Sequence, residues 1–88
     1  MNVNFKASFA KDLQKIANTN ILNQIKTIIE QVEQAPNLQE IKNLKKLKIS
    51  HFYYRIRVGS YRIGLLIENK VFSFVRCLHR RDFYKYFP

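Results

Sequence analysis

Three arginines close together in the middle of the chain are the residues best suited to chemistry. Arg55, Arg57 and Arg62 lie in one stretch that is rich in β-branched and aromatic residues. A guanidinium presents a planar fork of N–H donors that fits phosphate oxygens, and it stays charged at physiological pH. Three of them together are suited to binding a phosphate or to stabilising charge that builds on it. The same pattern also fits a solvated polar face of a half-buried sheet, so both interpretations stay open.

A second polar group lies near the end of the chain, where His79, Arg80, Arg81 and Tyr84 follow one another closely. Histidine titrates near neutral pH and is the commonest general acid or base in enzymes. If residues 80–85 form a helical turn, Tyr84 projects back over the end of the preceding strand. The structural alternatives are a surface histidine at a strand terminus and an aromatic residue in a core or interface.

Other kinds of chemistry have little support in the sequence. His51 and His79 are far apart, Cys77 is the one cysteine, and no carboxylates stand near them at ligand spacing. We therefore expect no metal site and no cofactor. The basic half of the chain has only Glu68 and Asp82 as carboxylates, which argues against a paired-carboxylate mechanism.

The arginines must be positioned by a β-hairpin over residues 53–67. Gly59-Ser60 suits a two-residue type II′ turn between two strand-like runs. This turn sets four cross-strand pairs: Val58 with Tyr61, Arg57 with Arg62, Ile56 with Ile63, and Arg55 with Gly64. Because side chains alternate along a strand, one face of the hairpin is apolar and the other carries the arginines. Like charges directly opposite each other are unfavourable, and a glycine inside a strand often marks the close approach of a ligand or another backbone.

Two helices are expected before the hairpin. Ser8 is a reasonable N-cap for the first, whose apolar residues are Phe9, Leu13, Ile16 and Ala17. Residues 18–20 form a break, and Thr19 or Asn20 can cap the second helix. An apolar stripe defines that helix, namely Ile21, Ile25, Ile28, Ile29 and Val32. Pro36 ends it, because the residue before a proline avoids the helical region.

The remaining segments are shorter. Residues 2–6 are a candidate first strand, and residues 71–78 are a central strand. The lysine-rich segment 43–50 is expected to be a basic loop, with a strand at its end as the alternative. The turn around Asn69 decides where Arg76 lies: three turn residues place it beside Arg62, and two place it on the opposite face.

These elements predict an α+β fold in a single domain covering residues 1–88. An N-terminal strand and two helices precede a mainly antiparallel sheet of about four strands, and a short helical turn closes the chain. The helices pack on the apolar face of the hairpin, which leaves the arginine face open.

The charge of the chain is strongly asymmetric. The net charge of +10 comes from 16 Lys+Arg against 6 Asp+Glu, and residues 1–41 are neutral, so residues 42–88 carry all of it. This asymmetry points to nucleic acid or another polyanion. Neither helix reads as basic and amphipathic, so a membrane surface is not the expected partner. We expect a cytoplasmic protein, since there is no apolar run typical of a signal peptide or a membrane span.

The arrangement of these motifs resembles the RelE/ParE superfamily of bacterial toxins. The resemblance rests on Tyr54 to Ile63 (YRIRVGSYRI), on Arg76 to Tyr84 (RCLHRRDFY) and on Phe9 to Ile16 (FAKDLQKI), so it spans nearly the whole chain. The RelE branch implies a ribosome-dependent endoribonuclease that cuts mRNA in the ribosomal A site without a metal. In this reaction a ribose 2′-hydroxyl attacks the adjacent phosphate. The resemblance also implies a cognate antitoxin, for which an acidic segment that folds on binding would complement the charge.

The resemblance assigns roles by position. Arg55 and Arg57 would stabilise the phosphate and the transition state, because arginine is a poor general base. Arg62 and Arg80 would hold the scissile phosphate, Tyr84 would stack on or orient a base, and His79 is the candidate acid or base. The residues expected to bind RNA backbone are Lys45, Lys46, Lys48, Arg76 and Arg81. Two alternatives stay open: a ParE-like toxin that blocks DNA gyrase, and a basic nucleic-acid-binding module without catalysis.

Overall fold

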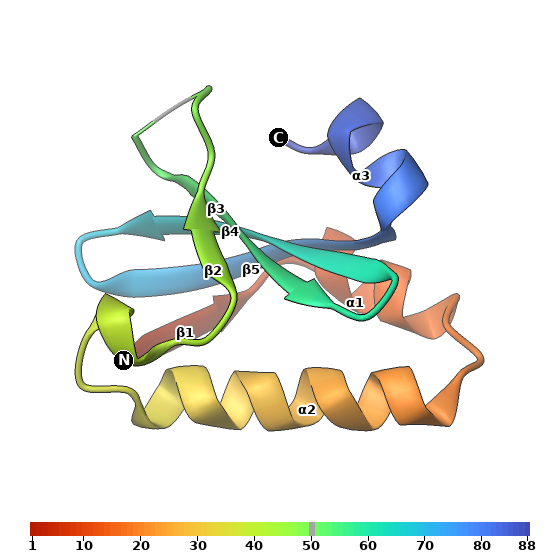
Figure 1. The fold of residues 1–88 in the computed structure, drawn as a ribbon, viewed down its shortest axis with the longest axis horizontal. Coiled ribbons are helices and arrows are strands. Elements are labelled where there is room, and N and C mark those ends of the chain that lie inside the picture. The colour runs from red at the N-terminus through yellow and green to blue at the C-terminus, as the bar shows by residue number, and fades with distance from the viewer. Residues whose placement is uncertain (50) are drawn as a thin grey trace.

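A five-stranded sheet with the order β1-β5-β4-β3-β2 lies between helices on its two sides (Figure 1). The computed structural model describes residues 1–49 and 51–88. Ser50, the last residue of the predicted basic loop, lies outside the described residues. The elements in chain order are β1 (Asn2–Phe5), α1 (Ala7–Gln14), α2 (Thr19–Gln34), the 3-10 helix η1 (Leu38–Glu40), β2 (Leu44–Lys46), β3 (Tyr53–Val58), β4 (Tyr61–Glu68), β5 (Val71–His79) and α3 (Arg80–Tyr86).

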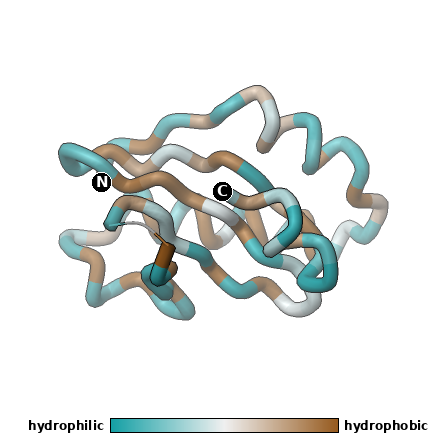
Figure 2. The backbone as a smooth tube through the Cα atoms, turned by 90° about the horizontal axis from the view of Figure 1, so that it is seen from above, coloured by the Kyte–Doolittle hydropathy of each residue, from teal (hydrophilic) through white to brown (hydrophobic). Residues whose placement is uncertain are grey.

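The main core lies between the sheet and the helices α1 and α2. Its fully buried side chains come from both layers and include Phe9, Ile25, Ile56, Leu65 and Phe72. Apolar residues are concentrated along the central strands, while the loops are mostly hydrophilic (Figure 2). The predicted α+β fold, with two helices packed on the apolar face of the hairpin, is therefore confirmed.

The hairpin of β3 and β4 has the predicted register. Arg57 faces Arg62, and Arg55 faces Gly64. Gly59 has a φ of 56°, as the first position of a type II′ turn requires.

Helix α2 ends before Pro36 as predicted, but the N-caps of both helices and the end of α1 differ from the prediction. Helix α1 ends at Gln14, and its N-cap is Lys6 without a side-chain cap. The Ser8 hydroxyl is used elsewhere: it donates to the carbonyl of Val75 on β5 at 2.6 Å. Helix α2 is capped by Asn18, whose side chain accepts from the backbone N–H groups of residues 20 and 21, and not by Thr19 or Asn20. Asn is as good an N-cap as Ser or Thr, so sequence alone does not separate these neighbours.

The sheet has one strand more than the four expected. Leu44–Lys46 pairs with β3 as the edge strand β2, where a loop was favoured. Three residues are too few to show a clear alternating pattern. At the other edge, β1 runs parallel to β5.

The position of Arg76 on β5 does not follow from the length of the turn around Asn69, contrary to the prediction. The turn has two residues, since Glu68 pairs with Val71, but the register shifts between Gly64 and Leu65. The shift leaves Val75 without a partner on β4. Arg76 becomes the cross-strand partner of Gly64. A β-bulge of this kind moves every later side chain of the strand to the other face of the sheet. No feature of the local sequence predicts it.

The arginine face is only partly open, contrary to the prediction. Helix α3 lies on the side of the sheet away from α2 (Figure 1). Its Phe83 and the following Phe87 form a second, smaller core with Leu47. Phe87 covers Gly64, so the gap expected beside Arg55 is filled by an aromatic ring. Seen from above, the C-terminal end lies over the middle of the sheet (Figure 2).

Candidate functional site

Four of the predicted site arginines gather on the face of the sheet that carries α3. Arg55 and Arg57 come from β3, Arg62 from β4, and Arg80 from the first position of α3. Residues 57 and 62 are cross-strand partners, so their side chains leave the sheet on the same face. These four residues are called the arginine cluster below.

Arg62 lies at the centre of the arginine cluster. Burial lowers the pKa of Arg62, and the charges of Arg55, Arg57 and Arg80 lower it further, while Tyr84 acts in the opposite direction. The guanidinium donates from Nη1 to the carbonyls of Gly59 at 3.0 Å and Tyr61 at 2.9 Å. It is therefore oriented by backbone oxygens and keeps its full positive charge, because arginine does not deprotonate in proteins.

No carboxylate neutralises this cluster within the described residues. The salt bridges found there join Arg76 to Asp12 and Arg81 to Asp82. Concentrated positive charge without a counterion is unfavourable for folding alone, and an incoming anion relieves it. Such an arrangement of arginines is chemically suited to a phosphate.

Tyr84 lies beside the arginine cluster. It lies on α3 with 61% of its surface exposed, close enough to Arg62 to influence its pKa. The buried residue before it, Phe83, anchors α3 to the sheet and contacts the Tyr84 ring edge-on at 5.0 Å. An exposed ring beside a group of arginines can stack on a nucleotide base.

The structure separates His79 from the arginine cluster. His79 is the cross-strand partner of Tyr61 and contacts its ring edge-on at 5.6 Å. Tyr61 packs against the main core, so the imidazole lies on the side of the sheet that α1 and α2 cover. Its Nδ1 caps α3 by accepting from the N–H of Arg81 at 3.2 Å.

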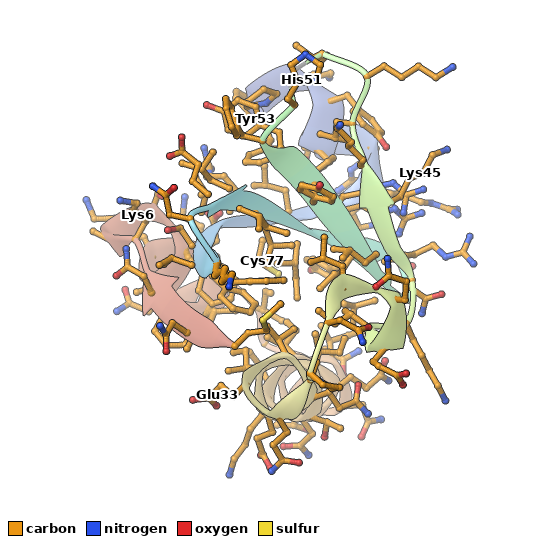
Figure 3. The ribbon with its side chains drawn as sticks, turned by 90° about the vertical axis from the view of Figure 1, so that its left-hand side faces the viewer. Lys6, Glu33, Lys45, His51, Tyr53 and Cys77 are labelled. Carbon is orange, nitrogen blue, oxygen red and sulfur yellow. The ribbon has the colours of Figure 1, made fainter. Side chains whose placement is uncertain are left out.

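The predicted RNA-binding residues divide into exposed and engaged ones. Lys45 is paired with Arg55 and extends the basic face toward β2, and an open hollow of about 300 Å³ lies between them. Lys45 projects outward from the edge of the molecule (Figure 3). Lys46 and Lys48 are also exposed. Arg81, on α3, is exposed as well. Arg76 is engaged: it donates to both carboxylate oxygens of Asp12, at 2.8 and 3.1 Å, and this interaction raises its pKa.

Comparisons with known proteins show the family to which this chain belongs. Residues 3–84 match the family described as ParE toxin of type II toxin-antitoxin system, parDE. Toxin RelE3 of Methanocaldococcus jannaschii is 44% identical over 89 aligned residues, which cover 100% of both chains. The chain belongs to the RelE/ParE family of type II toxins.

Solved structures show the same fold. The crystal structure of the RelB-RelE antitoxin-toxin complex from Methanococcus jannaschii superposes with a TM-score of 0.82 at 42% identity, covering 97% of this chain and 99% of that chain. The archaeal RelE-RelB complex from Pyrococcus horikoshii OT3 gives a TM-score of 0.72 at 22% identity, with 90% of this chain and 93% of that chain covered. At 22% identity, the similarity to the Pyrococcus horikoshii complex supports only the fold.

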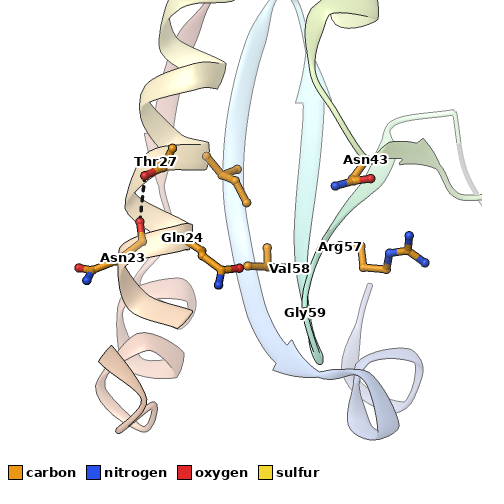
Figure 4. A pocket seen from close by; sticks show the side chains of 8 residues that line it. Asn23, Gln24, Thr27, Asn43, Arg57, Val58 and Gly59 are labelled. Carbon is orange, nitrogen blue, oxygen red and sulfur yellow. Dashed lines mark hydrogen bonds between the residues drawn. The ribbon is translucent and has the colours of Figure 1, made fainter. Parts of the chain in front are cut away.

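Two structural features of this RelE/ParE toxin were not predicted from its sequence. One is the packing of Phe87 on Gly64, for which the glycine inside a strand was the available signal. The other is a cleft of about 390 Å³ between α2 and the hairpin, lined by polar residues of α2 and by Asn43, Val58 and Gly59 (Figure 4). Arg57 also lines this cleft, so the cleft borders the arginine cluster, although the Arg57 guanidinium points away from α2 (Figure 4).

Cys77 is a buried free cysteine. It lies in the interior between the sheet and the helices (Figure 3), and burial raises the pKa of its thiol to about 12. A thiol is unreactive until it ionises. The described part of the chain has no group of three or more His, Cys, Asp or Glu placed to hold a metal ion. Within the same residues, no helix is long and apolar enough to cross a lipid bilayer.

Proposed function

We propose that this toxin is a ribosome-dependent endoribonuclease that cleaves mRNA in the ribosomal A site. The observation that carries the proposal is the arginine cluster, which lies beside the exposed Tyr84 and has no carboxylate partner in the described residues. Such a site suits an RNA phosphate with a neighbouring base. The full-length similarity to Toxin RelE3 supports the RelE-type activity over other uses of the fold.

The reaction requires a base for the 2′-hydroxyl proton, an acid for the leaving 5′-oxygen and cations for the charge that builds on the phosphate, and the arginine cluster would supply the cations. The ribose 2′-oxygen forms a bond to the adjacent phosphorus, and the bond from phosphorus to the 5′-oxygen breaks. The products are a 2′,3′-cyclic phosphate and a 5′-hydroxyl, and the proton lost by the 2′-oxygen balances the one gained by the leaving oxygen. Negative charge builds on the phosphate oxygens in between. Arg62 and Arg80 would hold the phosphate, and Arg55 and Arg57 would stabilise the transition state.

Tyr84 and the lysines would bind the rest of the substrate. Tyr84 would stack on a base next to the scissile phosphate, which fixes the nucleotide for in-line attack. Lys45, Lys46 and Lys48 are exposed on the edge strand β2 and just after it, where they would contact ribosomal RNA backbone. Arg81 is exposed and would contribute in the same way. Arg76 is held by Asp12, and we assign it no RNA contact.

A cognate antitoxin is the expected protein partner. The RelE proteins of both complexes described above are bound to a RelB antitoxin. In this chain a net charge of +10 and an arginine cluster without counterions would be complemented by an acidic segment that folds on binding. Binding over the cluster would block access to RNA.

Induced expression of the chain with primer extension across a translated message tests the activity. We expect cuts inside codons that disappear when translation initiation is blocked. The double substitution R62A/R80A should abolish both the cuts and growth arrest, because it removes the two groups assigned to the phosphate. Tyr86→Ala, an exposed aromatic residue of the same helix, is the matched control and should stay toxic. Full toxicity of the double variant would reject the proposal.

A gyrase-directed toxin is the second candidate, favoured by the match of residues 3–84 to the ParE toxin family. It predicts growth arrest and inhibition of DNA supercoiling without any cleavage of mRNA. A basic module without catalysis would cause neither.

A further inference from the structure

The ring of Phe87 lies directly against the backbone of Gly64 in the middle of the sheet. A Cβ built on Gly64 would meet Cδ1 and Cε1 of Phe87 at 2.7 Å and Cγ at 2.8 Å. Real Cβ atoms do not come this close to other atoms. Gly64 has no positive φ, unlike Gly59, so an alanine would fit the local backbone. The absence of a side chain at position 64 is therefore needed for the contact with Phe87.

A continuous series of ring contacts leads from Gly64 to Tyr84. Phe87 stacks on Phe83 with ring centroids 5.1 Å apart, and Phe83 contacts Tyr84 at 5.0 Å. The Phe87 N–H also donates to the carbonyl of Phe83 at 2.9 Å. Tyr53 closes the other side of Phe87 edge-on at 5.5 Å. Phe87 thus links α3 to the sheet at Gly64.

The contact between Phe87 and Gly64 is adjacent to the arginine cluster. Gly64 is paired with Arg55 on β3 and lies two residues after Arg62 on the same strand and face. Helix α3 begins with Arg80 and carries Tyr84. The main core, on the other side of the sheet, includes no residue of α3, so a displaced α3 would leave that core intact.

We propose that Phe87 is a positioning residue: by packing on Gly64 it fixes α3 and holds Tyr84 and Arg80 in place against Arg62. The proposal rests on the nuclease function proposed above. It predicts that the rate of cleavage depends on a contact between two residues that do not themselves touch RNA.

The test compares Gly64→Ala, Phe87→Leu and the double variant G64A/F87L in the full chain, with Tyr86→Ala as the control. The first readout is by nuclear magnetic resonance: the ring-current shift of the residue 64 α-protons and the amide shifts of residues 80–86. The second is the single-turnover rate of mRNA cleavage at saturating ribosome concentration. Far-UV circular dichroism confirms folding, and Phe87→Ala replaces Gly64→Ala if the latter does not fold.

Gly64→Ala should move the amide resonances of α3 and lower the cleavage rate at least about tenfold, because small misplacements of catalytic groups are costly. Adding Phe87→Leu should make room for the methyl group and recover most of both signals. Tyr86→Ala should change neither. Recovery by a second substitution distinguishes positioning from a general loss of stability.

Unchanged α3 resonances in Gly64→Ala would overturn the proposal, as would displaced resonances with an undiminished rate. A loss that Phe87→Leu does not relieve would also overturn it. If the unsubstituted protein cleaves no message, the proposed function fails. The resonances then still decide whether Phe87 positions α3.

Discussion

Arg62 is held in place by the backbone and not by a carboxylate. Two main-chain carbonyls, of Gly59 and Tyr61, accept from its Nη1. Because carbonyl oxygens carry no net charge, they orient the guanidinium without neutralising it, and its positive charge stays available to an incoming anion. The lowered pKa of Arg62 records burial and the repulsion of its arginine neighbours. At the scale of single residues, the arginines repel one another, and a bound anion would relieve this repulsion.

His79 is expected to cap α3 without transferring a proton. Its Nδ1 accepts from the N–H of Arg81, and its ring packs on Tyr61, away from the arginine cluster. Asn is a good N-cap, so His79→Asn preserves the cap while removing the imidazole. We expect this variant to cleave mRNA within about threefold of the normal rate, with an unchanged pH profile.

The control for this variant is His79→Ala, which removes the cap as well. It should lower the free energy of unfolding by about 1 kcal/mol. A loss of about a hundredfold or more in cleavage by His79→Asn, at normal stability, would instead establish His79 as the acid or base.

At the scale of elements, polar side chains of α1 complete the exposed edge of β5. Strand β1 pairs with β5 only as far as Phe74. Beyond it, Ser8 donates to Val75, while Asp12 accepts from the N–H of Cys77 at 2.9 Å and from Arg76. Helix α1 thus covers backbone groups that would otherwise invite pairing with another chain.

Removing the Asp12 carboxylate should be strongly destabilising. The side chain is only 4% exposed, and Asp12→Ala leaves a backbone N–H and a guanidinium without their acceptor. We expect the free energy of unfolding, measured by urea denaturation, to fall by about 2–4 kcal/mol. Asp82→Ala is the matched control, since its contact with Arg81 is at 4.0 Å and both side chains are exposed. That variant should lose less than about 1 kcal/mol. Similar losses in the two variants would show that burial of Asp12 is unimportant.

The elements differ in how far the sequence determines them. The hairpin and its register follow from Gly59-Ser60 and from strict alternation, and α2 follows from its apolar stripe. The bulge at Val75 and the short strand β2 depend on pairing with distant residues, so local pattern does not reveal them. The same holds for the site: three members of the arginine cluster, Arg55, Arg57 and Arg62, were predicted from the hairpin face, and Arg80 from the family resemblance. The separation of His79 and the pairing of Arg76 with Asp12 were not, because both depend on the bulge.

At the scale of the whole molecule, the two sides of the sheet have separate tasks. One side is covered by α1 and α2 and holds the main core. The other carries α3, a small aromatic core and the arginine cluster, and the excess positive charge lies in residues 42–88 that build it. Stability and the candidate site are thus placed on opposite faces, so substitutions in the arginine cluster should leave folding largely intact.

The most direct measurement is the cleavage of a defined mRNA bound to purified ribosomes, with the chemical identity of the new 3′ end determined. We expect cleavage only of ribosome-bound message, in a buffer with enough Mg²⁺ for the ribosome. The 3′ end should be a 2′,3′-cyclic phosphate, and R62A/R80A should lower the rate by at least about a thousandfold. A 3′-hydroxyl product, equal cleavage of free RNA, or an undiminished rate in the double variant would contradict a ribosome-dependent mechanism based on the arginine cluster.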